Sequence, residues 1–203
     1  MKKRKNIDKL ILIIGGGKIA RTYINAIREF NKTETFGDLI GIEVSRLNCL
    51  LFNYYLGEEA YPHIPKSFNE LSEALLFNRI IVMGGLQPGQ STTSVSVEVA
   101  EFIKADKIII LTDVEGIYDK DPNKFKNAKL LNQITYEELE NLIIQSVNSK
   151  QAAAGEYRIF DAVSLQLVKR CNIQVHIISG RDLNYLKRLW NEESNNFGTI
   201  IKK

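Results

Sequence analysis

The sequence has few of the residues that usually build metal sites or disulfide frameworks. It contains two cysteines and two histidines among 203 residues. Cys49 and Cys171 are far apart and each lies in an apolar segment, so we expect two free thiols and a reducing compartment. His63 and His176 share no metal-ligand spacing with either cysteine. The sequence therefore predicts no protein-bound zinc, and no metal ion held by side chains of the chain itself.

Long hydrophobic runs and a strong excess of one charge are also missing. The apolar run that follows the basic start MKKRKNIDK has five residues, which is too short for a signal-peptide core or a membrane span. The formal net charge of +3 is small and scattered, and no segment interleaves basic with aromatic residues as a nucleic-acid groove would. We expect a cytoplasmic protein that binds neither nucleic acid nor a membrane.

The composition is that of an ordinary globular protein, with 44% hydrophobic and 25% charged residues. No segment has the composition of a linker or a repeat, so we expect a single domain over residues 1–203. Apolar runs predict strands over residues 10–14, 79–85, 107–113, 173–179 and 199–203. Helical spacing predicts helices over residues 18–30, 38–55, 92–105, 136–144, 159–170 and 183–190. This alternation predicts an α/β protein with a largely parallel sheet covered on both faces.

Two of the expected strands run directly into glycines. Gly15-Gly16-Gly17 follows the first strand, and Gly84-Gly85, continued by LQPGQST, follows the second. In an open α/β sheet, ligands collect where strands end and helices begin, because free amides and the helix dipole favour anions there. Glycine lets backbone amides approach a phosphate closely, and Arg21 lies one helical turn beyond the first loop. We therefore expect two anion-binding loops for two phosphate-bearing ligands.

Each of these segments has alternative interpretations. The glycines alone could form a tight turn without a ligand, and GGGKIA also satisfies the dinucleotide-binding pattern G-x-G-x-x-A, with Glu43 at about the right distance to bind a ribose. The helical spacing that continues through Leu47 and Leu51 argues against the strand that this pattern requires. A Walker A loop is absent. The acidic segment LTDVEGIYDKDP lacks the final glutamate of an EF-hand, which leaves a solvated turn or a functional loop.

Five ordered motifs carry a resemblance to a known family. They are GGGKIARTYI, DLIGIEVSRLN, GGLQPGQST, TDVEGIYDKDP and AGEYRIFDAVSLQLVKR. In these residues the sequence resembles the amino acid kinase family, and within it the archaeal-type uridylate kinases. The resemblance implies a three-layer α/β/α fold, usually assembled as a homohexamer, that transfers a phosphoryl group from ATP to UMP with Mg²⁺ in pyrimidine nucleotide biosynthesis.

The same resemblance implies roles for individual residues. It makes Arg21 and Asp161 catalytic, with Arg21 facing the transferring phosphates and Asp161 orienting a catalytic lysine. Asp38 would bind the ribose hydroxyls of UMP. The full UMP site that it implies is Gly16, Asp38, Leu86, Gln87, Pro88, Gly89, Gln90, Ser91 and Thr92. The ATP site that it implies is Gly17, Arg21, Thr112, Asp113, Tyr118 and Asp121.

The sequence departs from the family pattern in two places. Glu115 stands where typical members have aspartate, which retains the charge. Family members also begin with a strand ending in Lys-x-Ser-Gly and a helix, which normally supply the catalytic lysine, whereas here residues 1–9 precede the first strand. We hypothesise that Met1 lies inside a longer reading frame or that the gene is truncated. Lys18 could replace the lysine, or it could be a solvated residue at a helix start.

Three functional interpretations follow from the sequence. The first is an active uridylate kinase. The second is a catalytically weak nucleotide-binding relative that acts by binding UMP or by assembling with active subunits. The third is a dinucleotide-binding oxidoreductase module, which the expected helix over residues 38–55 disfavours.

Overall fold

The computed structural model describes residues 7–120, 122, 125–148, 159–191 and 197–202. The chain divides into two compact units, Met1–Val95 and Ser96–Lys203. The boundary falls inside helix α4 (Thr92–Phe102), and each unit has its own sheet. The single domain expected from the sequence stays a prediction.

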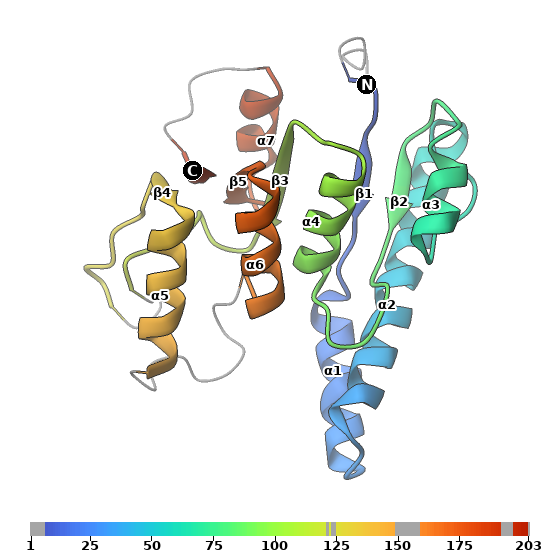
Figure 1. Ribbon diagram of the computed structural model, residues 1–203. Coiled ribbons are helices and arrows are strands. Elements are labelled where there is room, and N and C mark those ends of the chain that lie inside the picture. Colours follow the sequence, from blue (N-terminus) through green and yellow to red (C-terminus); the bar gives the residue numbers. More distant parts are fainter. Residues whose placement is uncertain (1–6, 121, 123–124, 149–158, 192–196, 203) are drawn as a thin grey trace. The chain divides into compact units, whose positions relative to one another are not determined.

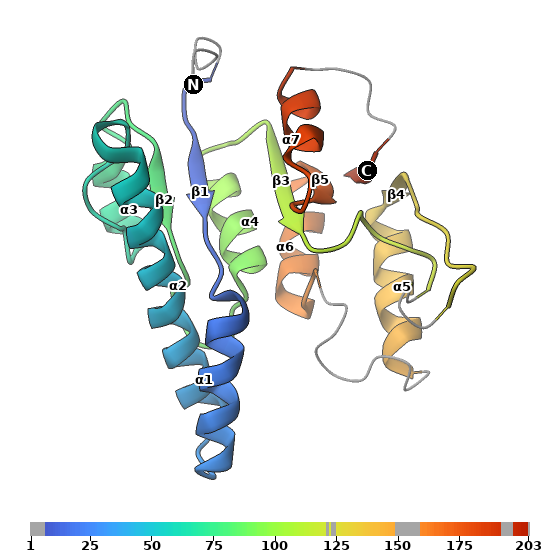
Figure 2. The ribbon, with the colours of Figure 1, turned by 180° about the vertical axis from the view of Figure 1, so that it is seen from behind.

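The first unit is built on two parallel strands. Strand β1 (Ile11–Ile13) pairs in parallel with β2 (Ile81–Met83), so both strands end at the same edge of this sheet. The helices of the unit are α1 (Gly17–Glu29), α2 (Glu34–Leu56), the 3-10 turn η2 (Gly57–Glu59) and α3 (Phe68–Ala74). Figures 1 and 2 show α1 and α2 packed side by side. Both glycine segments therefore begin at one edge of the sheet, beside α2.

Helix α2 begins earlier than its apolar spacing predicts. It starts at Glu34 after an extended Thr33, whereas the sequence places the start near Asp38. A carboxylate in the first turn is favourable at a helix N-terminus, and Glu34 supplies it four residues upstream of Asp38. Asp38 consequently lies in the second turn, near the N-terminus of the helix as predicted, but it does not begin the helix. Helix α3 and strand β4 (Gln133–Thr135) were not predicted, because seven and three residues carry little periodicity.

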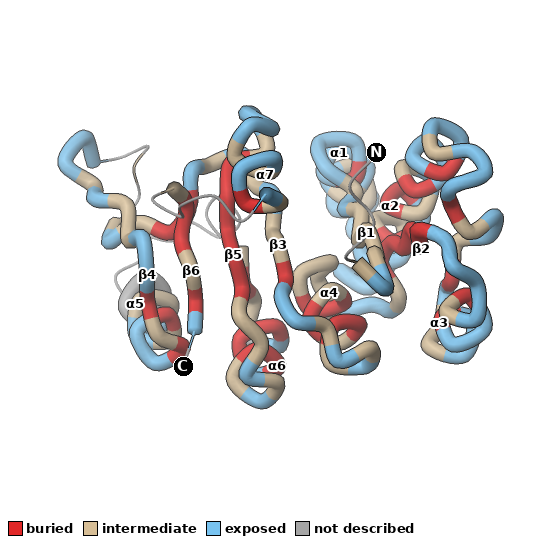
Figure 3. The backbone as a smooth tube through the Cα atoms, turned by 90° about the horizontal axis from the view of Figure 1, so that it is seen from above, coloured by how far each residue is buried: buried red, intermediate tan, exposed pale blue. Residues whose placement is uncertain are grey.

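The second unit has a four-stranded sheet between helices. Its order is β3-β5-β6-β4, and all neighbours are parallel except β5 and β6. Figure 3 shows α5 and α6 on one face of the sheet and α7 on the other, with β5 buried along most of its length. This layered arrangement confirms the α/β class. The bounds of the elements are β3 (Lys107–Thr112), α5 (Tyr136–Asn148), α6 (Ala162–Cys171), β5 (Gln174–Ser179), α7 (Leu183–Trp190) and β6 (Thr199–Lys202).

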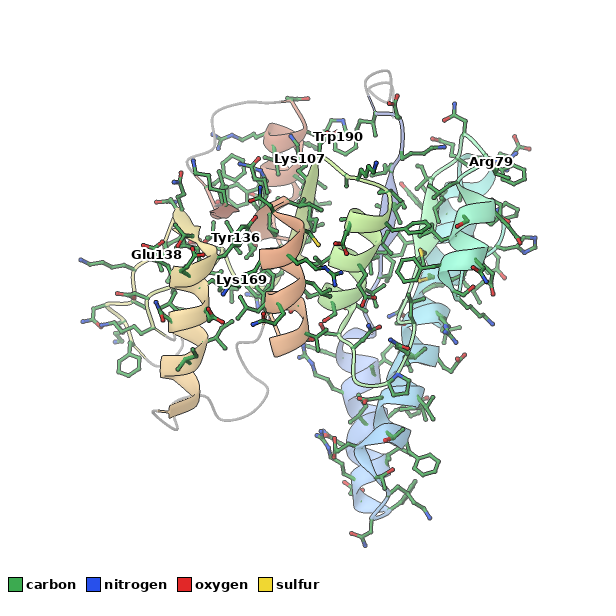
Figure 4. All side chains as sticks on the ribbon, in the orientation of Figure 1. Arg79, Lys107, Tyr136, Glu138, Lys169 and Trp190 are labelled. Atoms are coloured by element: carbon green, nitrogen blue, oxygen red, sulfur yellow. The ribbon has the colours of Figure 1, made fainter. Side chains whose placement is uncertain are left out.

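Side-chain caps set the starts of the helices that cover this sheet. Thr135 caps α5: its hydroxyl accepts from the amide of Glu138 at 3.1 Å, and the Glu138 carboxylate accepts from the amide of Thr135 at 2.7 Å. Helix α6 begins at Ala162 and not at Ile159, because Asp161 caps it by accepting from the amide of Ser164 at 2.7 Å. An ion pair of 2.6 Å between Lys169 and Glu140 joins α6 to α5 (Figure 4).

The buried His176 on β5 should make the stability of the protein depend on pH. Its side chain is 4% exposed and its Nε2 atom has no hydrogen-bond partner among the described residues. Burial lowers the pKa of His176 below its usual 6.5, and Lys107 at the start of β3 (Figure 4) lowers this pKa further. Since the unfolded chain takes up the proton first, the contribution of His176 to stability is complete above pH 6.5 and falls as the pH decreases, by up to about 1.4 kcal/mol per pH unit.

Urea unfolding between pH 5 and pH 8 measures this dependence. The variant His176→Leu should show a flatter loss of stability below pH 6.5 than the unsubstituted protein. The other histidine of the chain, the exposed His63, supplies the control, because His63→Gln should keep the original slope. Equal slopes for all three proteins would show that His176 does not cause the pH dependence of stability.

Candidate functional site

The first glycine segment is held between α1 and α2. Gly17 has φ of +61° and opens α1. A Cβ atom on Gly16 would meet the Cβ of Ala20 and lie 3.3 Å from the carbonyl oxygen of Gly41 on α2. The amide of the Asn48 side chain donates to the carbonyl of Gly15 at 2.8 Å. The position of this loop is thus fixed by α2, and a larger residue at Gly16 does not fit.

The second glycine segment is held by the same helix. The Ser45 hydroxyl accepts from the amide of Gly85 at 2.8 Å and donates to the carbonyl of Ile42 at 2.7 Å. A Cβ atom on Gly84 would lie 2.6 Å from the Ser45 hydroxyl, so only glycine allows this close approach. Farther along the loop, Gly89 has φ of +79° and its amide donates to the Asp38 carboxylate at 3.0 Å.

These contacts bring the residues expected to bind UMP into one region of the first unit. Asp38 contacts Gly89 directly. A Cβ on Gly15 would lie 3.4 Å from the hydroxyl of Thr92, at the end of the second loop, and the Ser91 hydroxyl accepts from the amide of Ser94 at 3.1 Å at the start of α4. The arrangement places backbone amides, two hydroxyls and a carboxylate together, which suits a ligand with a phosphate and neighbouring hydroxyl donors.

Removing the Ser45 hydroxyl should destabilise the first unit and loosen the second loop. The variant Ser45→Ala leaves the buried amide of Gly85 without its partner, which costs about 1–3 kcal/mol. Urea unfolding measures the change in the free energy of unfolding. The affinity for UMP shows whether the second loop keeps its position. Ser72→Ala is the matched control, because the Ser72 hydroxyl also donates to a helix carbonyl, that of Phe68, but at an exposed position of α3. Equal effects of the two substitutions would show that the Ser45 contact has no special role.

The second unit contains a separate pocket of about 460 Å³ at the carboxyl ends of β3 and β5, a volume typical of small-molecule sites. It includes two of the residues expected to bind ATP, Asp113 and Tyr118. Thr112 does not line the pocket, although its hydroxyl lies 3.3 Å from the Asp113 carboxylate. Asp121 lies outside the described residues. The lining residues are Asp113, Val114, Glu115, Tyr118, Pro122, Ser179, Arg181, Asp182 and Tyr185.

The pocket combines carboxylates with two tyrosines and one guanidinium. The Tyr118 hydroxyl donates to the Glu115 carboxylate at 3.1 Å. Partial burial and this carboxylate raise the pKa of Tyr118 above its usual value, so Tyr118 stays a neutral donor. Arg181 and Asp113 approach to 4.0 Å, but both side chains are 75% exposed, and such a surface pair contributes little to stability. Arg181 is therefore free to change partners when a ligand enters.

The site expected from the sequence omits seven residues of this pocket. Three of them, Val114, Glu115 and Pro122, belong to the motif TDVEGIYDKDP. The other four, which belong to no motif, are Ser179, Arg181, Asp182 and Tyr185. Together with Gly180 they form another junction in which a strand, β5, leads through a glycine to a helix, α7. Because β3 and β5 are parallel neighbours, their carboxyl ends meet at one edge of the sheet. The order of strand, glycine and helix that marks this junction was available in the sequence. The missed contacts of Ser45 and Asn48 in the first unit had no such signal.

The two residues expected to be catalytic have different surroundings. Arg21 is exposed at the start of the second turn of α1. Asp161 is partly buried, and its carboxylate caps α6.

Within the described residues, no group of three or more His, Cys, Asp and Glu side chains could hold a metal ion, and no described helix is long and apolar enough to span a membrane. Cys49 and Cys171 are both free, as expected.

The fold and these two regions define an α/β protein with glycine loops at strand ends, an arrangement that suits phosphate-bearing ligands. The chain belongs to the amino acid kinase family, whose model matches residues 2–179. It is 42% identical to a uridylate kinase of Methanobrevibacter smithii over 95% of this chain and 84% of that protein. It is 40% identical to a uridylate kinase of Sulfolobus acidocaldarius over 91% of this chain and 80% of that protein.

Solved structures of uridylate kinases have a similar fold. The structure is similar to that of a uridylate kinase from Archaeoglobus fulgidus, with a TM-score of 0.81 and 31% identity over 96% of this chain and 85% of that one. It also resembles a UMP kinase from Bacillus anthracis with a TM-score of 0.74, at 22% identity over 94% of this chain and 78% of that one. The latter likeness concerns the fold alone.

Proposed function

We propose that this protein transfers the γ-phosphoryl group of ATP to UMP, forming UDP for pyrimidine nucleotide biosynthesis in the cytoplasm. The contact between the Asp38 carboxylate and the amide of Gly89 carries the proposal, because it joins a ribose-binding carboxylate to an anion-binding loop. The 42% identity to a uridylate kinase supports it. The free cysteines are consistent with a reducing compartment.

UMP would bind to the first unit. The Asp38 carboxylate would accept hydrogen bonds from the two ribose hydroxyls, while amides of the loop from Leu86 to Thr92 would hold the phosphate and the base. Gly16 would contact the UMP phosphate from the first loop. A phosphate among backbone amides and hydroxyls needs no further cation to bind.

ATP would bind with its nucleoside in the pocket of the second unit. Asp113 and Tyr118 line it, and Thr112 and Asp121 complete the set of residues proposed for this nucleotide. Mg²⁺ would come bound to the ATP phosphates, as it usually does at kinase sites. No group of three or more carboxylates among the described residues is arranged to hold the ion, so the ATP phosphates would supply its main ligands.

The chemistry of phosphoryl transfer needs positioning and charge more than covalent help. Gly17 would donate its backbone amide and Arg21 its guanidinium to the oxygens of the moving phosphoryl group. Asp161 would act as a positioning residue through the cap that it forms on α6. We also propose that the protein works as a homo-oligomer, a hexamer by resemblance to its family.

A coupled assay of ADP release with UMP, CMP and AMP as acceptors tests the proposal. Turnover that depends on UMP, with a higher kcat/KM for UMP than for CMP or AMP, is the expected result. Binding of UMP in calorimetry without turnover would overturn the kinase proposal in favour of a nucleotide-binding relative. NADH binding without either would favour a dinucleotide-binding module.

A further inference from the structure

A stack of two aromatic rings and a guanidinium lies beside the pocket of the second unit. Tyr185, in the first turn of α7, lines this pocket. Its ring stacks on the ring of Phe197, which precedes β6, with the two centroids 5.2 Å apart and an angle of 26° between the rings. The guanidinium carbon of Arg188, one turn farther along α7, lies 4.7 Å from the Phe197 centroid. We call Tyr185, Phe197 and Arg188 the aromatic stack.

The sheet of the second unit fixes the position of the aromatic stack. Gly198, directly after Phe197, has φ of +71°, and a Cβ atom there would overlap the carbonyl oxygen of Ile177 on β5. Only glycine allows the backbone to approach β5 this closely. Phe197 is therefore anchored to the sheet, and it supports Tyr185 from a segment other than α7. Because contacts within the protein hold the Tyr185 ring, a ligand that stacks on it has little ordering cost to offset.

The supported ring of Tyr185 leaves part of its surface to the pocket. Phe197 is not among the described residues that line the pocket, so it supports Tyr185 from outside. Tyr118 lines the pocket from a different segment, the loop after β3. Its backbone pairs with Leu130, and its hydroxyl donates to the Glu115 carboxylate at 3.1 Å. Two fixed aromatic rings in the lining of a cavity of about 460 Å³ suit a flat heterocyclic ring.

The charges of the pocket favour the base of a nucleotide over its phosphates. Asp113, Glu115 and Asp182 bring three carboxylates into the lining, and among the described lining residues Arg181 is the one cation. An excess of carboxylates repels phosphates, whereas the exocyclic amino group of a base can donate hydrogen bonds to carboxylate oxygens. Every nucleobase also has a π face that stacks on an aromatic side chain. The part of a nucleotide that fits this pocket is therefore the base.

We propose that Tyr185 stacks on the purine ring of ATP and makes a purine triphosphate the preferred phosphoryl donor over a pyrimidine triphosphate. This inference rests on the ATP site proposed above and adds a specificity-determining residue to it. Two fused rings cover more of the tyrosine than the single ring of a pyrimidine does, so stacking contributes more to the binding of ATP than to that of CTP. Phe197 acts as a positioning residue, because it contacts Tyr185 and does not line the pocket.

Calorimetric titration of the protein with ATP and with CTP, each with Mg²⁺ and without UMP, tests the proposal. Tyr185→Leu should raise the Kd for ATP by about 5–100-fold, the usual effect of removing a side chain on which a base stacks. The same substitution should raise the Kd for CTP less, so the preference for ATP falls. Tyr185→Phe keeps the ring and should bind ATP within about twofold of the unsubstituted protein. Tyr55→Leu is the control, because Tyr55 is 87% exposed in the first unit, and it should change neither Kd.

A variant outside the pocket protects the test against misfolding. Phe197→Leu keeps Tyr185 but removes the ring that supports it, so it should raise the Kd for ATP in the same direction and by less than Tyr185→Leu does. Circular dichroism of both variants should match that of the unsubstituted protein. If Tyr185→Leu does not fold, the ratio of the Kd values for ATP and CTP in Phe197→Leu decides, and an unchanged ratio would overturn the proposal.

The outcomes separate this inference from the proposed function. An unchanged Kd for ATP in Tyr185→Leu, or an equal rise of the Kd for ATP and for CTP, would overturn the role of Tyr185 while the coupled assay could still show UMP-dependent turnover. A protein that binds ATP through Tyr185 and does not phosphorylate UMP would overturn the kinase proposal alone. A protein that binds neither triphosphate would overturn both.

Discussion

Replacing Asp38 with asparagine is expected to raise the KM for UMP by about 10–100-fold. The Asp38 carboxylate would accept hydrogen bonds from two ribose hydroxyls, and a hydrogen bond to a charged group contributes about 1.5–3 kcal/mol. Asparagine keeps the shape and an oxygen that can accept from the amide of Gly89, but it loses the charge. The loop should therefore stay in place while ribose binding weakens, so kcat should change less than KM.

Steady-state kinetics of the Asp38→Asn and Asp38→Ala variants separate the two roles of this carboxylate. Alanine also releases the amide of Gly89, so it should lower kcat further than asparagine does. Glu58→Gln supplies a control for loss of one negative charge, because Glu58 is exposed in η2 beyond the far end of α2. If Asp38→Asn and Glu58→Gln have the same KM for UMP, Asp38 does not bind the ribose.

The elements that the sequence predicts well are those with a strong local signal. Helix α7 has the predicted bounds, Leu183–Trp190, because its apolar spacing and the Asp182 cap agree. Helix α2 was predicted with a late start, since Glu34 to Gly37 contain little of the apolar spacing on which the prediction relied. The short β4 forms through its pairing with β6, a segment more than sixty residues away, which no local pattern reveals.

The candidate site likewise has parts that the sequence predicts and parts that it does not. Glycines at strand ends are a local signal, so both loops of the first unit were predicted from the sequence. The side chains that hold these loops, Ser45 and Asn48, come from the middle of α2, where a polar residue on a helix is ordinary. Their roles depend on the close packing of α2 against the loops, which only tertiary structure provides.

Replacing Arg21 with methionine is expected to lower kcat by about 10²–10³-fold, which is the typical cost of removing one donor that stabilises charge in a transition state. Arg21 is exposed, and it makes no hydrogen bond or ion pair among the described residues. The free energy of unfolding should therefore change by less than about 0.5 kcal/mol. A loss of kcat without a loss of stability, measured by the coupled assay and by urea unfolding, identifies a residue that acts on the reacting phosphates.

Lys18 supplies the decisive comparison, because it is also an exposed cation near the start of α1. If Lys18 is only a solvated residue at a helix start, Lys18→Met should keep kcat within about twofold of the unsubstituted value, a difference of under 0.5 kcal/mol in the barrier. Both variants remove one positive charge beside the same glycine loop, so a general electrostatic effect would lower both rates equally. A large loss in Lys18→Met alone would instead make Lys18 the cation that serves the transferring phosphoryl group and would contradict the role proposed for Arg21.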